Sequence, residues 1–272
     1  MAVKSLLHVH TDYCDGSDSP EAMVAAALRA GFSAIGLLMH SPTDLADDGM
    51  PPPARVPLFL EEVGRLKEVY RGQIEIAAGV EWDAVSSIDP SLFDYTVGSV
   101  HVVRAPDGAA YYVDETPARL LEAVETGFGG NGEALAAAYF EQLASFVLAV
   151  KPTVVGHFDL IRKFNGDGRF FDEASPIYRG AAQKALDKLI ADGAVFELNA
   201  GVGARSGSEL FMPADEWLAY IAERGGRVML SSDAHSADKL LYRLEEAENR
   251  LRQLGFGTVM QWAGGQLSPT AL

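Results

Sequence analysis

Cysteine and basic residues are both scarce in this 272-residue sequence. Cys14 is the single cysteine, so the chain can form no internal disulfide, which fits a reducing compartment such as the cytoplasm. Only 22 Lys and Arg accompany 38 Asp and Glu, and the formal net charge is −16. Binding to nucleic acid and electrostatic binding to a membrane both need a basic surface, so we expect neither partner.

Long hydrophobic runs are also missing. The apolar start of the chain is interrupted by His8 and His10, and the longest uncharged stretch, residues 253–272, is rich in Gly and Gln. Neither segment resembles a signal peptide or a membrane-spanning helix. We therefore expect a soluble cytoplasmic protein.

Short apolar runs alternate with helical patterns from one end of the chain to the other. Each run is bounded by Gly, Pro, Ser or charged residues, as is typical of a buried parallel strand. The predicted strands are residues 5–9, 34–39, 74–80, 95–100, 153–156, 194–198 and 228–230. The predicted helices are one that follows Ser19 and ends before Gly31, and residues 57–71, 116–125, 133–150, 181–192, 213–224 and 237–254.

Seven such alternations without a change in composition predict one α/β domain, residues 1–272, built as a barrel. The length agrees, because an α/β barrel usually needs about 250 residues. After the last helix, two short apolar segments around Gly264-Gly265 predict a small C-terminal hairpin.

The six histidines share one kind of position. Each lies at the C-terminal end of a predicted strand or just beyond it, and in a parallel barrel these ends converge on the face where active sites are built. A lone histidine is more often structural than a ligand, but six in equivalent positions indicate a common site. They are His8, His10, His40, His101, His157 and His235.

Three carboxylates accompany the histidines: Asp15 in the first loop, Glu81 after the third strand, and Asp233 beside the last histidine. Nine nitrogen or oxygen donors without a thiolate favour divalent ions such as Zn, Mn or Fe. Because a catalytic ion usually has three or four protein ligands, nine residues suit two or three ions. We expect Cys14 to pack beside Asp15 rather than to ligate.

The chain resembles the polymerase-and-histidinol-phosphatase (PHP) superfamily, and most closely its histidinol-phosphatase branch, in seven successive segments. These are HVHTDYCDGSDSPEAMV, LLMHSP, GVEWD, GSVH, GHFDLIRKFN, FELNA and LSSDAH. The resemblance runs from His8 to at least His235. It implies a distorted, TIM-like (β/α)7 barrel with three divalent metal ions and a phosphatase activity, most specifically on L-histidinol phosphate in histidine biosynthesis.

The resemblance also implies a role for each candidate ligand. The first ion would bind His8, His10, Glu81 and Asp233; Glu81 would bridge to a second ion at His101 and His157; Asp15, His40 and His235 would hold the third. Asp233, His235 and Glu81 would lie at the reacting centre, with Asp233 either taking a proton from water or giving one to the leaving alkoxide. Relatives commonly have an acidic residue where this chain has Met39, so the outer partner of His40 is open.

Such a site could hold an anion despite the acidity of the chain. Three divalent ions and three ionised carboxylates would leave it about three units positive, and a hydroxide bridging two ions would be the nucleophile. Candidate phosphate ligands are Arg162 and Lys163, beyond His157, and Arg205, in a Gly-rich loop. Each could instead be a solvated loop cation. Asn199 could contact substrate or cap the backbone.

Three alternatives remain open at this point. An amidohydrolase-like barrel also begins with His-x-His but uses one or two ions. A PHP phosphoesterase could act on another small phosphate or nucleotide. A PHP domain could also have kept the fold as a non-catalytic binding module. The sequence does not indicate an oligomeric state.

Overall fold

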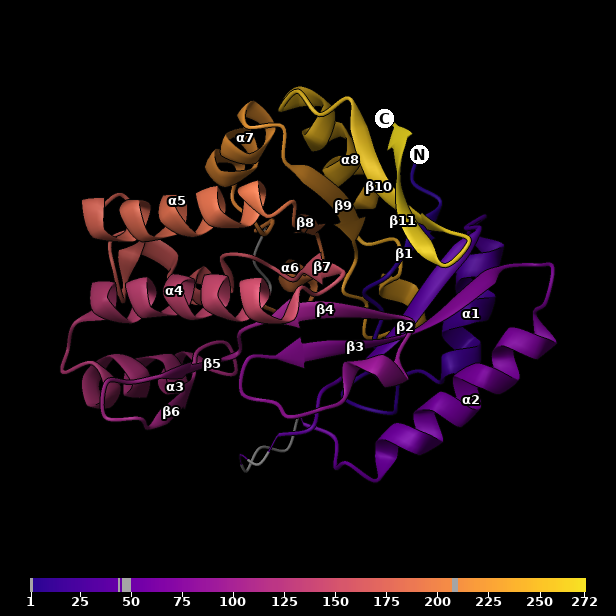
Figure 1. The fold of residues 1–272 in the computed structure, drawn as a ribbon, viewed down its shortest axis with the longest axis horizontal. Helices are drawn as coiled ribbons and strands as arrows, with labels where there is room; N and C mark the ends of the chain where they lie inside the picture. The colour runs from indigo at the N-terminus through magenta and orange to yellow at the C-terminus, as the bar shows by residue number, and fades with distance from the viewer. Residues whose placement is uncertain (1, 44, 46–49, 207–209) are drawn as a thin grey trace.

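The computed structural model describes residues 2–43, 45, 50–206 and 210–272, and of residues 205 and 206 it describes the backbone alone. Seven parallel strands form one sheet, and helices cover its outer face (Figure 1). In sheet order the strands are β1 (Ser5–Leu6), β2 (Ala34–His40), β3 (Glu75–Asp83), β4 (Tyr95–Ser99), β7 (Val154–Val155), β8 (Val195–Asn199) and β9 (Arg227–Ser231).

The helices follow the strands along the chain. They are α1 (Pro20–Arg29), α2 (Arg55–Val69), α3 (Pro117–Glu122), α4 (Gly132–Val150), α5 (Pro176–Ala191), α6 (Val202–Ser206), α7 (Asp215–Glu223) and α8 (Leu244–Gln253). Shorter helical turns are η1 (Pro90–Leu92), η2 (Ala123–Gly127), η3 (Leu160–Arg162), η4 (Gly166–Gly168) and η5 (Ala237–Lys239). Two hairpins complete the fold, β5 (Val102–Arg104) with β6 (Ala110–Tyr112) and β10 (Thr258–Ala263) with β11 (Gln266–Ala271).

The sheet is a nearly closed barrel whose seam lies between β9 and β1. At the C-terminal ends of the strands, Val9 and Ala234 form a parallel bridge, and the backbone N–H of His10 donates to Ala234 at 2.8 Å. At the opposite end β10 fills the seam, because the backbone N–H of Trp262 donates to Ser5 Oγ at 2.9 Å. Figure 1 shows this hairpin beside the N-terminus. The predicted seven-stranded barrel and C-terminal hairpin are confirmed.

Strand alternation divides the interior into two apolar regions. On β2, Ile35 and Leu37 belong to the large cluster between sheet and helices, whereas Ala34 and Leu38 belong to a smaller cluster inside the barrel. The side chain of Tyr95 lies in the inner cluster and donates its hydroxyl to the Leu7 carbonyl at 2.6 Å. His40, two residues beyond Leu38, therefore projects inward above an apolar floor.

Some predicted boundaries were wrong. The helix predicted for residues 237–254 is divided into η5 and α8, because Arg243 takes a left-handed conformation with φ of 49° and lies over the Phe211 ring. Helix α5 begins at Pro176 rather than at residue 181, since Ser175 caps it by accepting from Tyr178 N–H. The β5–β6 hairpin was not predicted, and the Gly-rich loop contains the short helix α6.

Helix α4 is the one helix in the described ranges that is long and apolar enough to cross a membrane. Its composition has another explanation here. Leu135, Tyr139, Phe140 and Leu143 are fully buried in the core between sheet and helices.

The inner floor of the barrel provides a stability test at Gly79. A Cβ at this position would overlap the Tyr95 ring. We expect Gly79→Ala to lower the free energy of unfolding by about 1–3 kcal/mol, because the Tyr95 ring is buried and its hydroxyl is hydrogen-bonded to the Leu7 carbonyl. Chemical denaturation measures the change. Gly64→Ala is the matched control: it lies on the exposed face of α2 with no neighbour within 4 Å, and should raise stability by about 0.5–1 kcal/mol.

Candidate metal centre

The nine predicted ligands come together at the C-terminal end of the barrel. They form four overlapping groups, and within each group one possible ligand atom per residue lies within 4.8 Å of the others. The groups are His10, Asp15, His40 and His235; His8, His10 and Asp233; His8, Glu81 and His157; and His40, Glu81 and His101. Each segment contributes only one to three of these residues, so the barrel itself assembles the cluster.

Glu81, near the end of β3, lies at the centre of the cluster. Its side chain is 1% exposed, and its two oxygens face different histidines. Oε1 lies 2.8 Å from His157 Nε2 and 3.2 Å from His101 Nε2. Oε2 faces His40 Nδ1 at 3.1 Å, His10 Nε2 at 3.4 Å and His8 Nε2 at 3.5 Å. A carboxylate with two separately surrounded oxygens can bridge two ions.

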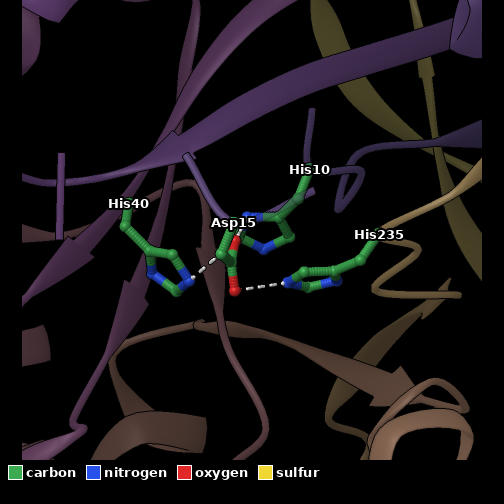
Figure 2. Close-up of side chains that lie close together, drawn as sticks. All are labelled: His10, Asp15, His40 and His235. Atoms are coloured by element: carbon green, nitrogen blue, oxygen red, sulfur yellow. Dashed lines mark hydrogen bonds and ion pairs between the residues drawn. The ribbon is translucent and has the colours of Figure 1, made fainter. Parts of the chain in front are cut away.

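Asp15 organises the more open side of the cluster, as Figure 2 shows. Its Oδ1 lies 3.4 Å from His10 Nδ1 and 3.5 Å from His40 Nε2, and its Oδ2 lies 3.0 Å from His235 Nε2. The His10 and His235 rings are stacked, with centroids 4.1 Å apart. The Asp15 side chain is 36% exposed, so this group faces the entrance to the site.

Asp233 projects from the turn after β9. Its φ of 43° is left-handed, a conformation that non-glycine residues adopt mainly where the surrounding structure enforces it. Oδ1 lies 3.4–3.5 Å from the Nε2 atoms of His10 and His8. Gly201 permits the turn, because a Cβ there would overlap the carbonyl of Ser232.

Two buried carboxylates behind the histidines were not predicted. His8 Nδ1 lies 2.8 Å from Glu197 Oε2, and His101 Nδ1 lies 3.1 Å from Asp83 Oδ2. These contacts favour the Nδ1–H tautomers, which leave both Nε2 atoms able to bind an ion. Glu197 also accepts from the backbone N–H of His157 at 2.7 Å. Spacing could have suggested both residues, since Asp83 follows Glu81 by two and Glu197 precedes Asn199 by two.

Met39 does not face the site. It packs in the cluster between sheet and helices, on the opposite face of β2 from His40. An acidic side chain at position 39 would therefore point away from the His40 ring. The ring nitrogens of His40 face Asp15 and Glu81, and the ring itself lies beside those of His10 and His101, all of them ligand candidates themselves.

The electrostatics of the cluster fit cation binding. Burial acts to raise the pKa of Glu81, but His101, His40 and His8 outweigh it and hold that pKa well below its usual range. Burial, together with His235, lowers the pKa of His10 to about 3, so its imidazole is neutral and its lone pair is available. Glu81 and His10 thus provide an ionised carboxylate and a neutral nitrogen donor. Burial acts to lower the pKa values of His8, His40 and His101, but the neighbouring carboxylates outweigh it and raise them, so a bound divalent ion would displace protons from these three histidines.

Cys14 packs in the half-buried position that the sequence suggested. Its Sγ lies 3.3 Å from His10 Nδ1, and burial raises the pKa of the thiol to about 12. A thiol with this pKa stays protonated at neutral pH. The donors that surround the cluster are thus nitrogen and oxygen atoms, which suit Zn, Mn or Fe.

A cavity of about 210 Å³ opens onto the cluster, and the four phosphate-ligand candidates relate to it differently. Lys163 lines this cavity, with Nζ 3.1 Å from Asp114 Oδ2. Arg162 does not line it: its guanidinium pairs with Glu173 at 3.1 Å and lies beside two other surface pockets. The lining residues are Asp15, His40, Met50, Glu81, His101, Tyr112, Asp114, Glu115, His157, Leu160, Lys163 and Asp233.

The other two candidates for contact with the substrate are Asn199 and Arg205. Asn199 is fully buried; its Oδ1 accepts from Gly201 and Val202 N–H, and its Nδ2 donates to Glu197 and Asp233. Of the two roles that the sequence left open for Asn199, a contact with substrate or a backbone cap, these bonds favour the cap, and they also orient Asp233. Arg205 belongs to α6, but its side chain lies outside the described residues.

Comparisons with known proteins agree with this architecture. A curated relative, the histidinol-phosphatase of Bacillus subtilis, is 26% identical over 265 residues, covering 88% of this chain and 96% of its own. The crystal structure of a Listeria monocytogenes protein has a TM-score of 0.77 at 20% identity and covers 88% of this chain and 97% of its own. That of the Lactococcus lactis histidinol phosphate phosphatase, complexed with zinc, L-histidinol and phosphate, has a TM-score of 0.70 at 18% identity and covers 97% of this chain and 98% of its own.

At these identities the two solved structures show a shared fold. The sequence match is more specific, because the family model described as PHP domain matches residues 7–201, well over half of the chain. With the barrel, the order of its motifs and this match in agreement, the chain belongs to the PHP domain family.

Proposed function

We propose that this protein is a metal-dependent phosphomonoester hydrolase, and specifically an L-histidinol-phosphate phosphatase acting in cytoplasmic histidine biosynthesis. The observation that carries the proposal is the cavity whose lining combines six of the nine clustered nitrogen and oxygen donors with one lysine. The named activities of the relatives in Bacillus subtilis and Lactococcus lactis supply the substrate.

The donor set suits three divalent ions, distributed as the family resemblance implies. Glu81 has one oxygen toward His101 and His157 and the other toward His8, His10 and His40. The Asp15 group shares His10 and His40 with neighbouring groups, but its four donors are enough for an ion of its own. Bound divalent ions lower the pKa of water toward about 7 and offset charge on the phosphoryl oxygens. An amidohydrolase-like site with one or two ions would not need this third group.

Residues of the chain bind the phosphoryl group and transfer the proton. Lys163 Nζ contacts a phosphoryl oxygen, while Asp114 holds the ammonium in place. Asp233 Oδ1 takes the proton of the attacking water, and Asn199 fixes the carboxylate by donating to Oδ2 at 3.1 Å. The Asp233 carboxyl then gives this proton to the leaving alcohol, because both ring nitrogens of His235 are engaged, Nδ1 by the Asp233 carbonyl at 2.9 Å and Nε2 by Asp15 Oδ2 at 3.0 Å. Hydrolysis thereby forms one P–O bond to water, breaks one to the alcohol, and returns the proton to the alcohol.

Metal content tests the bridging role of Glu81. Glu81→Ala should lose more metal per chain than His101→Ala, because the carboxylate belongs to two candidate groups and the histidine to one. Elemental analysis of the purified variants, loaded under identical conditions, measures the difference. Equal or smaller loss in Glu81→Ala would contradict a bridge.

The adjacent cations Arg162 and Lys163 make a matched pair. Lys163→Met should lower kcat/KM about 10- to 100-fold without emptying the metal sites, because a charged hydrogen bond to the phosphoryl group is lost. Arg162→Met should chiefly lower the melting temperature, since Arg162 pairs with Glu173 outside the cavity. Steady-state kinetics measure the effect on kcat/KM, and thermal unfolding measures the effect on the melting temperature. A larger kinetic effect from Arg162 would reverse the assignment.

The substrate itself is tested with a panel of phosphomonoesters. We expect metal-loaded enzyme to prefer L-histidinol phosphate over nucleoside monophosphates and an aryl phosphate by at least tenfold in kcat/KM, and chelation to abolish the activity reversibly. Phosphate release measures both. Activity without that preference would indicate a PHP phosphoesterase for another phosphate, whereas no activity on any member would favour a binding module.

A further inference from the structure

We propose that Glu115 recognises a positively charged group on the alcohol part of the substrate. This inference rests on the phosphatase function proposed above and names the residue that selects the leaving group. It concerns the wall of the cavity that lies away from the candidate metal ligands.

That wall carries an excess of negative charge. It includes Tyr112, the last residue of β6, Asp114 and Glu115 just beyond it, and Leu160 and Lys163 from the segment around η3. Two carboxylates against one ammonium leave it with one net negative charge. A wall that contacted only a phosphoryl group, itself nearly doubly negative near neutral pH, would gain nothing from this excess. The charge therefore indicates a substrate whose other end is a cation.

The two carboxylates of the wall are not equivalent. Asp114 forms a close pair with Lys163, and their side chains are only 16% and 11% exposed. The Glu115 side chain is 40% exposed and lies at the rim of the same cavity. Lys163 and Asp114 thus neutralise each other deep in the wall, and the excess charge resides on Glu115.

The present partner of Glu115 can be exchanged without leaving a charge unpaired. Arg119 Nε lies 3.3 Å from Glu115 Oε2, and Arg119 Nη1 lies 3.2 Å from Glu122 Oε2. Both pairs are solvent-exposed, and such pairs contribute little to stability. When a substrate ammonium binds Glu115, Arg119 keeps Glu122. The aromatic side chain of Tyr112 on the same wall suits an organic cation.

Two substrates that differ by one ammonium group test the proposal. These are L-histidinol phosphate and 3-(imidazol-4-yl)propyl phosphate, compared at pH 8, where an unperturbed imidazole is neutral. Glu115→Gln should lower kcat/KM about tenfold for the first and leave the second unchanged, mainly through KM. Glu115→Lys should lower kcat/KM for L-histidinol phosphate further, because it places a positive charge beside the substrate ammonium. Glu125→Gln, which removes an exposed carboxylate that is not among the residues lining the cavity, should retain the wild-type ratio of kcat/KM values, and all variants should retain the wild-type metal content.

Three outcomes would overturn the role of Glu115. Glu115→Gln could lower kcat/KM equally for both substrates, it could leave kcat/KM unchanged for both, or the wild-type enzyme could hydrolyse both substrates with the same kcat/KM. Each of these requires an active wild-type enzyme, so each is distinct from a failure of the proposed function. A wild type that hydrolyses no phosphomonoester would overturn the proposed function, and this inference with it.

Discussion

Negative charge buried at one end of the barrel is the constraint on which the rest of the structure depends. Glu81, Asp83, Glu197 and Asp233 are each at most 3% exposed, and burying a carboxylate costs several kcal/mol unless neighbours compensate. Each lies beside at least one imidazole. Protons and metal ions compete for the same histidine nitrogens, so a cluster that needs positive charge to be stable also favours divalent cations over protons as pH rises.

Strand alternation is the device that brings this charge together without exposing the core. On β3, Ile76 and Val80 pack toward the helices, while Ala77 lies in the inner cluster and Glu81, four residues further, projects into the site. Tyr95 closes the floor below and leaves the carboxylates in contact with their histidines rather than with bulk water. The C-terminal hairpin completes the floor from the seam side, which explains why a peripheral element packs so tightly on β1.

The sequence predicted the barrel and the nine clustered residues because histidine is rare in this chain and its position at successive strand ends is recognisable. Glu197 and Asp83 were not predicted, because their spacing from Asn199 and Glu81 places them on the inner strand face but does not show which histidine across the barrel each would contact. Arg162 and Lys163 could not be distinguished for a similar reason. The direction in which each side chain points depends on the backbone turn at η3 and on its carboxylate partner. That partner is Glu173 for Arg162 and Asp114 for Lys163.

The overall acidity of the chain and an anionic substrate are compatible because they act at different distances. At physiological salt, exposed charges are screened over about 8 Å, so surface carboxylates contribute little at the centre of the site. There the ions and Lys163 would dominate the field. At the rim of the cavity the electrostatic field is negative instead, because Glu115 is exposed there and the chain as a whole is acidic. A molecule with a negative phosphoryl end and a positive alcohol end matches both fields in one orientation, with its phosphate inward. A doubly anionic phosphate without a cation matches only the inner field.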